Sequence, residues 1–179
     1  PRWMGFERRM IEHLLASPDD HVGAFRKLPT NLQLMTVHAL QSIVFNKSLQ
    51  RRLDEGLPLS RPVVGDVVGR IDEKSQLDVN SCVVVNDRTL NRIGRNCDLG
   101  RLMTTGPLPG SDITTSEGLP GELEGATIVA EGLSDVSWNV EAIPRLSSKG
   151  TRRGLVAEFN EFSVDTVPIA DGTTLDKRW

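Results

Sequence analysis

The spacing of apolar residues changes near Pro62, and this change limits the folds that the chain can adopt. Before Pro62, apolar side chains recur every three or four residues, which is the spacing of an amphipathic helix. After it come paired valines and β-branched runs interrupted by glycine, as in PVVGDVVGRID and SCVVVN. Such runs are typical of short strands. The sequence therefore predicts an α+β protein, with a helical region followed by a compact region of strands and helices.

Capping and stop residues place the individual elements. Helices are predicted over residues 4–15, 22–28, 32 to about 53 and 118–132, with one more from a cap at Asp87 to about Cys97. Strands are predicted on both sides of a turn within residues 62–72, over 81–86 as a buried strand, over 101–105 and over 155–164, with 165–179 as a hairpin loop. The long third helix has an apolar set that could seat it in a core: Leu32, Met35, Ala39, Leu40, Ile43 and Val44.

Charge is distributed unevenly along the chain. The net charge is -3, from 21 basic and 24 acidic side chains, which is not the balance of a protein that binds polyanions with its whole surface. Acidic residues gather between positions 102 and 149, so arginine-rich patches remain elsewhere. This asymmetry permits a nucleic-acid-binding face without requiring one.

Several classes of site are absent from the sequence. The two cysteines, Cys82 and Cys97, and the three histidines match no zinc spacing, and no phosphate-binding loop or nucleophile motif is present. We therefore expect free thiols and no metal site. No run of about 18 apolar residues occurs, so we expect no membrane span. Free thiols suit a reducing compartment, so we expect a cytoplasmic protein. The chain begins without Met inside a helical pattern, which suggests an internal portion of a longer protein.

Two segments carry side chains suited to RNA. On the third helix, His38, Gln41, Ser42, Phe45 and Asn46 form a second stripe that could stack on a base and bind its edge. The alternative is that these residues satisfy buried backbone groups, which is the commoner role of such side chains. The segment SSKGTRRG supplies a basic loop that could contact phosphates or be an ordinary solvated loop; its charged members are Lys149, Arg152 and Arg153. A further arginine set is interpreted as a solvated helix face: Arg88, Arg92, Arg95 and Arg101.

The stretch from Leu28 to Val68, which contains HALQSIVFN and GLPLSRPVVGDVV, resembles the tRNA pseudouridine synthase D family. The segments GRLMTTGPLPG, GELEGA and SSKGTRR then follow in the order of that family, so the resemblance covers nearly the whole chain. The compact middle region looks more like the archaeal branch than the bacterial one. The chain departs from the family pattern at Leu40 and Ile43, where the family tends to have tyrosine.

The resemblance implies an isomerase that converts a uridine in tRNA to pseudouridine without a cofactor. It implies a catalytic domain, residues 1–61 and 149–179, interrupted by an insertion domain over residues 62–148. The family's aspartate motif is not found, so no catalytic residue is named and the chain alone is expected to be inactive. His38, Gln41 and Asn46 are expected to line or support the cleft, and the three cations of the basic loop to contact phosphate.

A rival hypothesis is a non-catalytic module of the same fold that binds RNA or another protein. The acidic stretch between residues 102 and 149 mildly favours a protein partner for that region. Pseudouridine formation by the complete protein separates the two hypotheses.

Overall fold

The chain folds around a curled antiparallel sheet in the computed structural model, which describes residues 4–72, 76–157 and 163. The strands are β1 (Val67–Ile71), β2 (Leu77–Val84), β3 (Leu102–Leu108) and β4 (Thr151–Gly154), in the order β2-β1-β3-β4. The two outer strands, β2 and β4, also contact each other, so the sheet is strongly curled.

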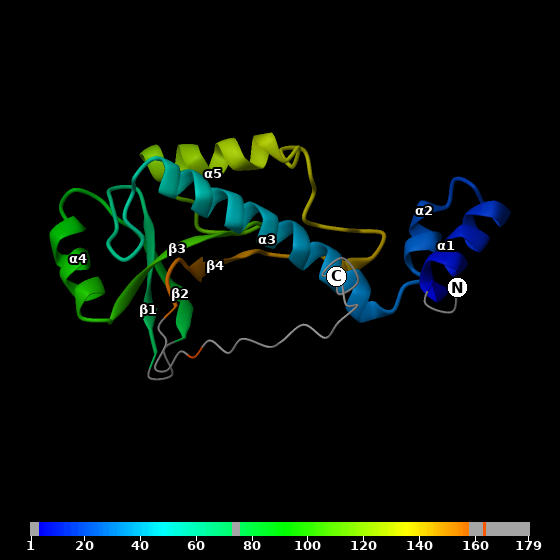
Figure 1. Ribbon diagram of the computed structural model, residues 1–179, viewed down its shortest axis with the longest axis horizontal. Helices are drawn as coiled ribbons and strands as arrows, with labels where there is room; N and C mark the ends of the chain where they lie inside the picture. Colours follow the sequence, from blue (N-terminus) through cyan, green and yellow to red (C-terminus); the bar gives the residue numbers. More distant parts are fainter. Residues whose placement is uncertain (1–3, 73–75, 158–162, 164–179) are drawn as a thin grey trace, which may run out of the picture.

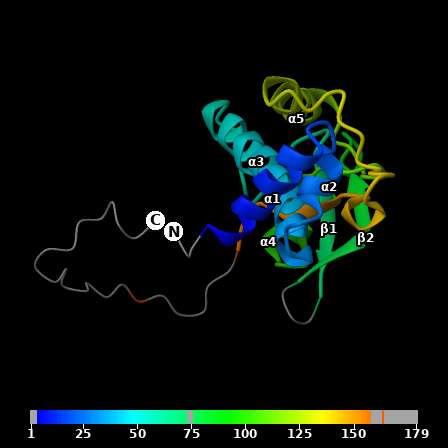
Figure 2. The same ribbon diagram turned by 90° about the vertical axis from the view of Figure 1, so that its right-hand side faces the viewer.

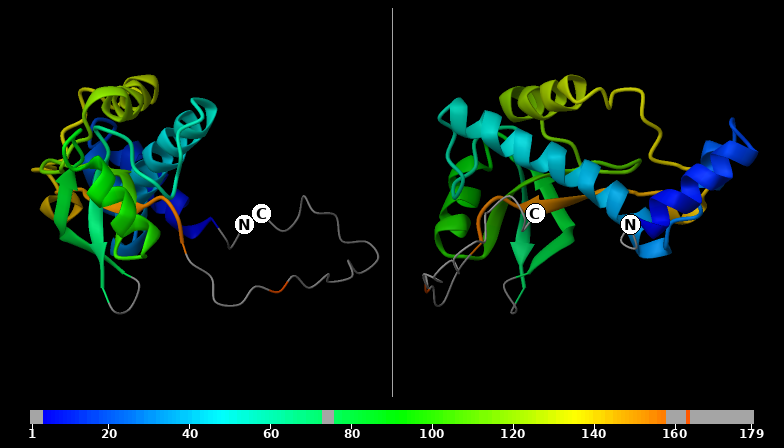
Figure 3. Two further views of the ribbon diagram at one scale, coloured as in Figure 1. Left: turned by 90° about the vertical axis from the view of Figure 1, so that its left-hand side faces the viewer. Right: turned by 45° about the vertical axis from the view of Figure 1, so that its right-hand side comes forward.

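The helices differ in how they contact this sheet. The long helix α3 (Thr30–Asp54) lies across β3, and α5 (Gly118–Ala130) runs beside α3, as Figures 1 and 3 show. Helix α4 (Leu90–Asp98) packs on the sheet at one end of the molecule, and α1 (Gly5–Ala16) and α2 (His21–Phe25) form a pair at the other (Figure 1). Figure 2 views the molecule from the α1–α2 end. A 3-10 turn, η1 (Pro144–Leu146), precedes β4.

Helix α3 confirms the predicted long helix and its stop at Gly56, but it buries a different face from the one expected. Its buried side chains are Gln33, Gln41, Val44, Phe45, Ser48 and Arg52. By contrast, Met35 of the predicted apolar set is 59% exposed and Ile43 is 40% exposed. Ala39 and Leu40 are exposed as well, so the expected seating is wrong for four residues of the set. The reason is that Gln33, Gln41 and Arg52 of the buried stripe reach hydrogen-bond partners in segments outside the helix.

The segment between α3 and β1 is a turn built around Asp66. The Arg52 guanidinium forms a two-pronged ion pair with this carboxylate, at 2.6 Å to Oδ1 and 2.8 Å to Oδ2, and both side chains are buried. Asp66 Oδ2 also accepts the backbone N–H of Val63 at 2.7 Å. Gly65 adopts φ 92°, and a side chain there would collide with the backbone of Glu117. The strand predicted before the turn is therefore wrong, and only Val67–Ile71 forms a strand.

Other strand predictions are partly corrected. The strand predicted over residues 81–86 begins earlier, at Leu77, and lies at the edge of the sheet, so Val83 is 53% exposed instead of buried. The strand predicted over 101–105 continues to Leu108. Of the strand predicted over 155–164 the structure describes only 155–157 and 163, none of which is in a strand, and the predicted hairpin loop 165–179 lies outside the described residues.

Two helix boundaries also differ from the predictions. The helix expected from Asp87 begins at Leu90, because the side chain of Asn86 accepts the backbone N–H groups of Arg88 and Thr89, both at 3.1 Å, and closes a turn first. Helix α2 ends at Phe25, before the predicted Leu28. The helices predicted over 4–15 and 118–132 are confirmed within two residues.

The predicted division into residues 1–61, 62–148 and 149–179 stays a prediction. Packing is continuous across both expected boundaries. Helix α3 contacts β3, and β4 pairs with β3 over the register Thr105↔Gly154 to Leu108↔Thr151. The flanking segments and the middle segment therefore share one sheet.

Replacing Asp66 with Asn preserves the shape of the side chain but leaves the Arg52 guanidinium buried beside a neutral amide. We expect the free energy of unfolding to fall by about 3–5 kcal/mol, the typical result of removing one partner of a buried pair. Urea-induced unfolding followed by circular dichroism measures this change. Asp54→Asn is the matched control, because Asp54 is exposed and accepts from Gln50; its effect is expected to stay within about 0.5 kcal/mol. Equal losses in the two variants would contradict the assignment.

Candidate nucleic-acid interface

The predicted basic loop over residues 147–154 is a loop only over 147–150, because Thr151–Gly154 forms β4 and carries Arg152 and Arg153. The remaining part, which keeps the name basic loop, is fastened to α3 by Gln41. Its amide Nε2 donates to the backbone oxygen of Pro109 at 2.8 Å and to Ser148 Oγ at 2.9 Å. Gln41 is buried, and its amide satisfies a backbone oxygen instead of facing a base. This is the structural role that the sequence left open for it. Because Ser148 precedes Lys149, the same contacts position the predicted phosphate-binding loop.

Two chain segments meet in this loop at unusually short range. The backbone N–H of Ser111 donates to Ser148 O at 3.0 Å, and that of Asp112 donates to Lys149 O at 2.9 Å. Gly150 has φ 77°, and a side chain on Gly110 would collide with its backbone. The glycines are therefore required by the close approach of the two segments, which holds Lys149 in a fixed loop.

Arg152 is the centre of a buried network. Its guanidinium binds Glu124 at 2.8 and 3.1 Å, and its side chain is only 2% exposed. It also donates to Thr105 O at 2.8 Å, to Thr114 O at 3.3 Å and to Ser116 Oγ at 3.1 Å. These bonds connect β4, β3 and α5. Burial on this scale argues against a direct contact of Arg152 with phosphate and favours a supporting role.

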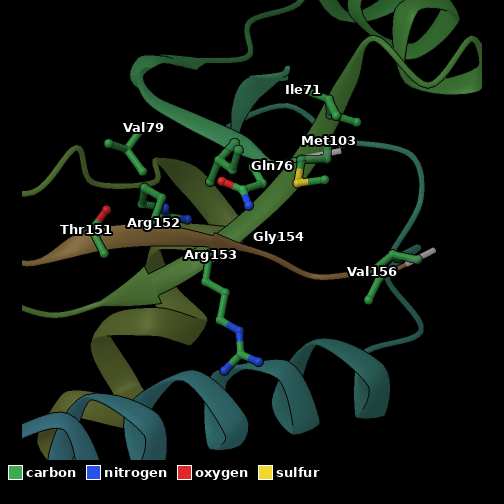
Figure 4. Close-up of a pocket in the computed structure, with 11 residues that line it drawn as sticks. Ile71, Gln76, Val79, Met103, Thr151, Arg152, Arg153, Gly154 and Val156 are labelled. Atoms are coloured by element: carbon green, nitrogen blue, oxygen red, sulfur yellow. The ribbon is translucent and has the colours of Figure 1, made fainter. Parts of the chain in front are cut away.

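Arg153 points the opposite way, because successive side chains of a strand alternate between its two sides. Its guanidinium carbon lies 5.0 Å from the centre of the Phe45 ring, toward α3, as Figure 4 shows for the direction of the side chain. Phe45 is buried, so its ring is not available to stack on a base. Arg153 is exposed, and its guanidinium forms no ion pair with a carboxylate in the described part of the chain. A cation fixed over an aromatic face is well placed for an anion from solvent.

The remaining predicted site residues lie on the surface. His38, Asn46 and Lys149 are exposed, and no side-chain hydrogen bond involves them within residues 4–72 and 76–157. The structure thus brings Gln41 to the basic loop and Phe45 to Arg153. It leaves His38, Asn46, Lys149 and Arg153 open to solvent on α3 and beside β4.

Sequence reasoning missed a groove between β2 and β4. It has a volume of about 440 Å³. Figure 4 shows side chains from β2, β3 and β4 around it, with Gln76 and Met103 opposite Val156. Its lining is mostly apolar, a composition common in ligand pockets. Only the curl of the sheet brings these strands together, so no sequence signal marks the groove.

The described residues hold no group of three metal-ligating side chains, and none of their helices is long and apolar enough to cross a membrane. Cys82 and Cys97 are free and half-buried. Partial burial raises the pKa of both thiols above the ordinary value. These thiols are therefore poor nucleophiles and poor metal ligands at neutral pH.

Comparison with known proteins identifies the family. The model of the family "tRNA pseudouridine synthase D (TruD)" matches residues 1–174, so the chain belongs to this family. A protein of Methanosarcina mazei named "Probable tRNA pseudouridine synthase D" is 42% identical over 158 residues, which are 88% of this chain and 36% of that protein. One of the same name from Halobacterium salinarum is 34% identical over 175 residues, 95% of this chain and 39% of that protein. The expected family and its archaeal type are confirmed.

A solved structure agrees with this assignment. A crystal structure of a tRNA pseudouridine synthase D family protein from Methanosarcina mazei matches with a TM-score of 0.80 at 42% identity, covering 87% of this chain. It confirms the α+β fold. The match covers 36% of that protein, so the chain spans about a third of the length of its relatives.

Replacing Gln41 with Leu removes both amide contacts without creating a large cavity. We expect the free energy of unfolding to fall by about 1–3 kcal/mol, because the oxygen of Pro109 loses its buried donor. Amide hydrogen exchange at Ser111 and Asp112 should accelerate, since the loop they pair with is no longer fastened. Gln50→Leu makes the same chemical change at an exposed position of α3 and is expected to alter neither measurement. Unchanged exchange in the Gln41 variant would contradict the positioning role.

Proposed function

We propose that the complete protein isomerises a uridine in tRNA to pseudouridine, and that this chain supplies part of its RNA-binding face. The observation that carries the proposal is family membership across residues 1–174, joined to an exposed cation, Arg153, held at a fixed position over Phe45. We further propose that the protein acts in the cytoplasm.

The chemistry restricts what this chain can contribute. In the isomerisation the bond between the ribose C1′ and the uracil N1 breaks, and a bond from C1′ to C5 forms, so no atom is gained or lost overall. Such a reaction requires a carboxylate at the reacting base, a pocket for a flipped uridine and cations on the RNA backbone. We propose no catalytic carboxylate among the residues described. We propose that this chain contributes to the pocket for the flipped uridine and supplies cations that bind the RNA backbone.

The exposed and buried site residues have separate roles in this proposal. Lys149 and Arg153 contact phosphates, with Arg153 able to offer a planar two-donor edge. His38 and Asn46, on the exposed side of α3, contact the RNA at the edge of the cleft. Gln41 and Arg152 hold the loop and the strand that carry the cations, and so act as positioning residues.

The decisive test combines an activity assay with a binding assay on the complete protein. Incubation with a uridine-containing tRNA transcript and mapping of pseudouridine tests the isomerase activity. In the variant Lys149→Gln/Arg153→Gln we expect tRNA affinity to fall at least about tenfold, equivalent to about 1.4 kcal/mol. The slope of log K against log salt concentration should fall by about 2, because each of the two cations neutralises one phosphate in the unaltered protein.

A matched variant controls for net charge. Arg8→Gln/Lys27→Gln removes the same two charges from exposed positions on and near the α1–α2 pair and is expected to leave affinity and salt slope unchanged. Equal losses in both variants would contradict a local phosphate site. If the unaltered protein binds tRNA but forms no pseudouridine, the rival hypothesis of a non-catalytic RNA-binding module is supported instead.

A further inference from the structure

Helix α4 carries an arginine face that the proposed function does not use. Arg92, Arg95 and Arg101 line a shallow concavity of about 370 Å³ on α4 and the residues that follow it. Helix α4 lies at the end of the molecule that faces the viewer in the left view of Figure 3. The concavity is completed by Asn91, Asn96 and Leu99. We call these six residues the α4 arginine face. The three arginines are exposed, and Leu99 is 59% exposed.

These arginines, like Arg153, lack a carboxylate partner in the described part of the chain, and they differ from Arg153 in lying together around one concavity. Arg8, Arg52, Arg61 and Arg152 each form an ion pair, with Glu12, Asp66, Asp98 and Glu124 in turn. Within the described residues no such pair involves Arg92, Arg95 or Arg101.

The acidic residue of α4 is also occupied. Asp98 accepts from Arg61 Nε at 2.7 Å, and this hydrogen bond holds the pKa of Asp98 below its ordinary value. Asp98 therefore stays charged and paired with Arg61. It lines a neighbouring concavity with Arg95, but within the described residues it forms no ion pair with that arginine, and the three arginines outnumber this one acidic side chain of α4.

The arginine side chains of this face do not anchor α4 to the sheet. Helix α4 is anchored by Ile93, Leu90 and Cys97, which pack against Val68 and Val85. The arginines lie on the other side of the helix, where neighbours three positions apart repel because both are positive. An external polyanion that bound to this surface would neutralise the arginines and so remove the repulsion between them.

We propose that the α4 arginine face binds the phosphate backbone of the RNA substrate, an inference that rests on the proposed function. Guanidinium groups offer planar pairs of donors that match phosphate oxygens, and asparagine amides bind sugar and phosphate oxygens. A protein partner fits less well, because the core of a protein interface is rich in aromatic and apolar side chains, and among the lining residues of this face Leu99 is the single apolar one and none is aromatic.

The face lies apart from the basic loop, so the two would hold different parts of one RNA. In Figure 1, α4 lies at the end of the molecule opposite α1 and α2, with α3 spanning the distance between. Arg70 of β1 is also exposed and pairs in register with Leu102, next to Arg101, which extends the positive surface from α4 toward the groove between β2 and β4. Two linked attachment points raise the overall affinity well above that of either one.

The test uses the complete protein and a tRNA transcript, with affinity measured by fluorescence anisotropy at several salt concentrations. The variant Arg92→Gln/Arg95→Gln/Arg101→Gln is expected to bind at least tenfold more weakly, with KM for tRNA raised accordingly. Its salt slope should fall by about 2 to 3, because each phosphate contact accounts for about 0.7 to 0.9.

Two matched variants make the result specific. Arg8→Gln/Arg9→Gln/Arg51→Gln removes the same net charge from α1 and α3 and is expected to keep the affinity and salt slope of the unaltered protein. Arg92→Lys/Arg95→Lys/Arg101→Lys preserves the charge, so its salt slope should be close to that of the unaltered protein even where affinity falls modestly. The lysine variant also controls for folding. If replacing the three arginines disturbed the fold, the lysine variant would lose binding as the glutamine variant does.

Several outcomes overturn the inference. It fails if the glutamine variant binds tRNA with the affinity and salt slope of the unaltered protein. A variant that keeps tRNA binding but loses binding to another protein would overturn the inference in the same way. It also fails if the control on α1 and α3 weakens binding equally, or if the lysine and glutamine variants have the same reduced slope. The proposed function fails separately, when the unaltered protein forms no pseudouridine, because the binding measurements do not depend on turnover.

Discussion

The ion pair between Arg52 and Asp66 is the contact on which the rest of the structure depends. It joins the last turn of α3 to the residue before β1, so it sets where the long helix stands relative to the sheet. Arg52 also donates to the oxygen of Pro58 at 2.9 and 2.7 Å, which closes the connecting loop onto the same guanidinium. The backbone of Asp66 accepts from Val85 N at 2.8 Å, so the end of β2 is tied to the same turn. The two residues of this ion pair thereby connect a helix, a loop and two strands.

Polar contacts of this kind replace much of the apolar core. The buried hydrophobic side chains are few and scattered over several elements, whereas Gln33, Gln41, Arg52, Asp66 and Arg152 are all buried. Apolar contacts tolerate sliding, but hydrogen bonds and ion pairs require particular partners at particular angles. The arrangement of α3, α5 and the basic loop is consequently defined by a small number of directional bonds. This explains why the loop with Lys149 is fixed although it lies on the surface.

The sequence predicts helix positions better than it predicts which side of a helix is buried. Spacing and stop residues locate α1, α3 and α5, because these signals are local. The buried face of α3 depends on acceptors far away in the sequence, such as the oxygen of Pro109 for Gln41, and no periodicity encodes them. The same limit applies to β2. A run of valines would be buried in a central strand, but β2 lies at the edge of the sheet and its residues are half-buried or exposed. The residue pattern likewise indicates a single basic cluster over residues 147–154, whereas β4 directs its two adjacent arginines to opposite sides of the sheet.

Whether an arginine is paired decides its role more than its place in the sequence does. Arg152 and Arg153 are neighbours, yet one is enclosed by Glu124 and backbone oxygens and the other lies open over Phe45. Most of the described arginines form no ion pair with a carboxylate, even though acidic side chains outnumber basic ones in the chain. What distinguishes Arg92 and Arg95 is that they lie together on one concave surface. An acidic protein can recognise a polyanion in this way, because a few unneutralised cations at fixed positions, and not the net charge, determine the local field that the RNA meets.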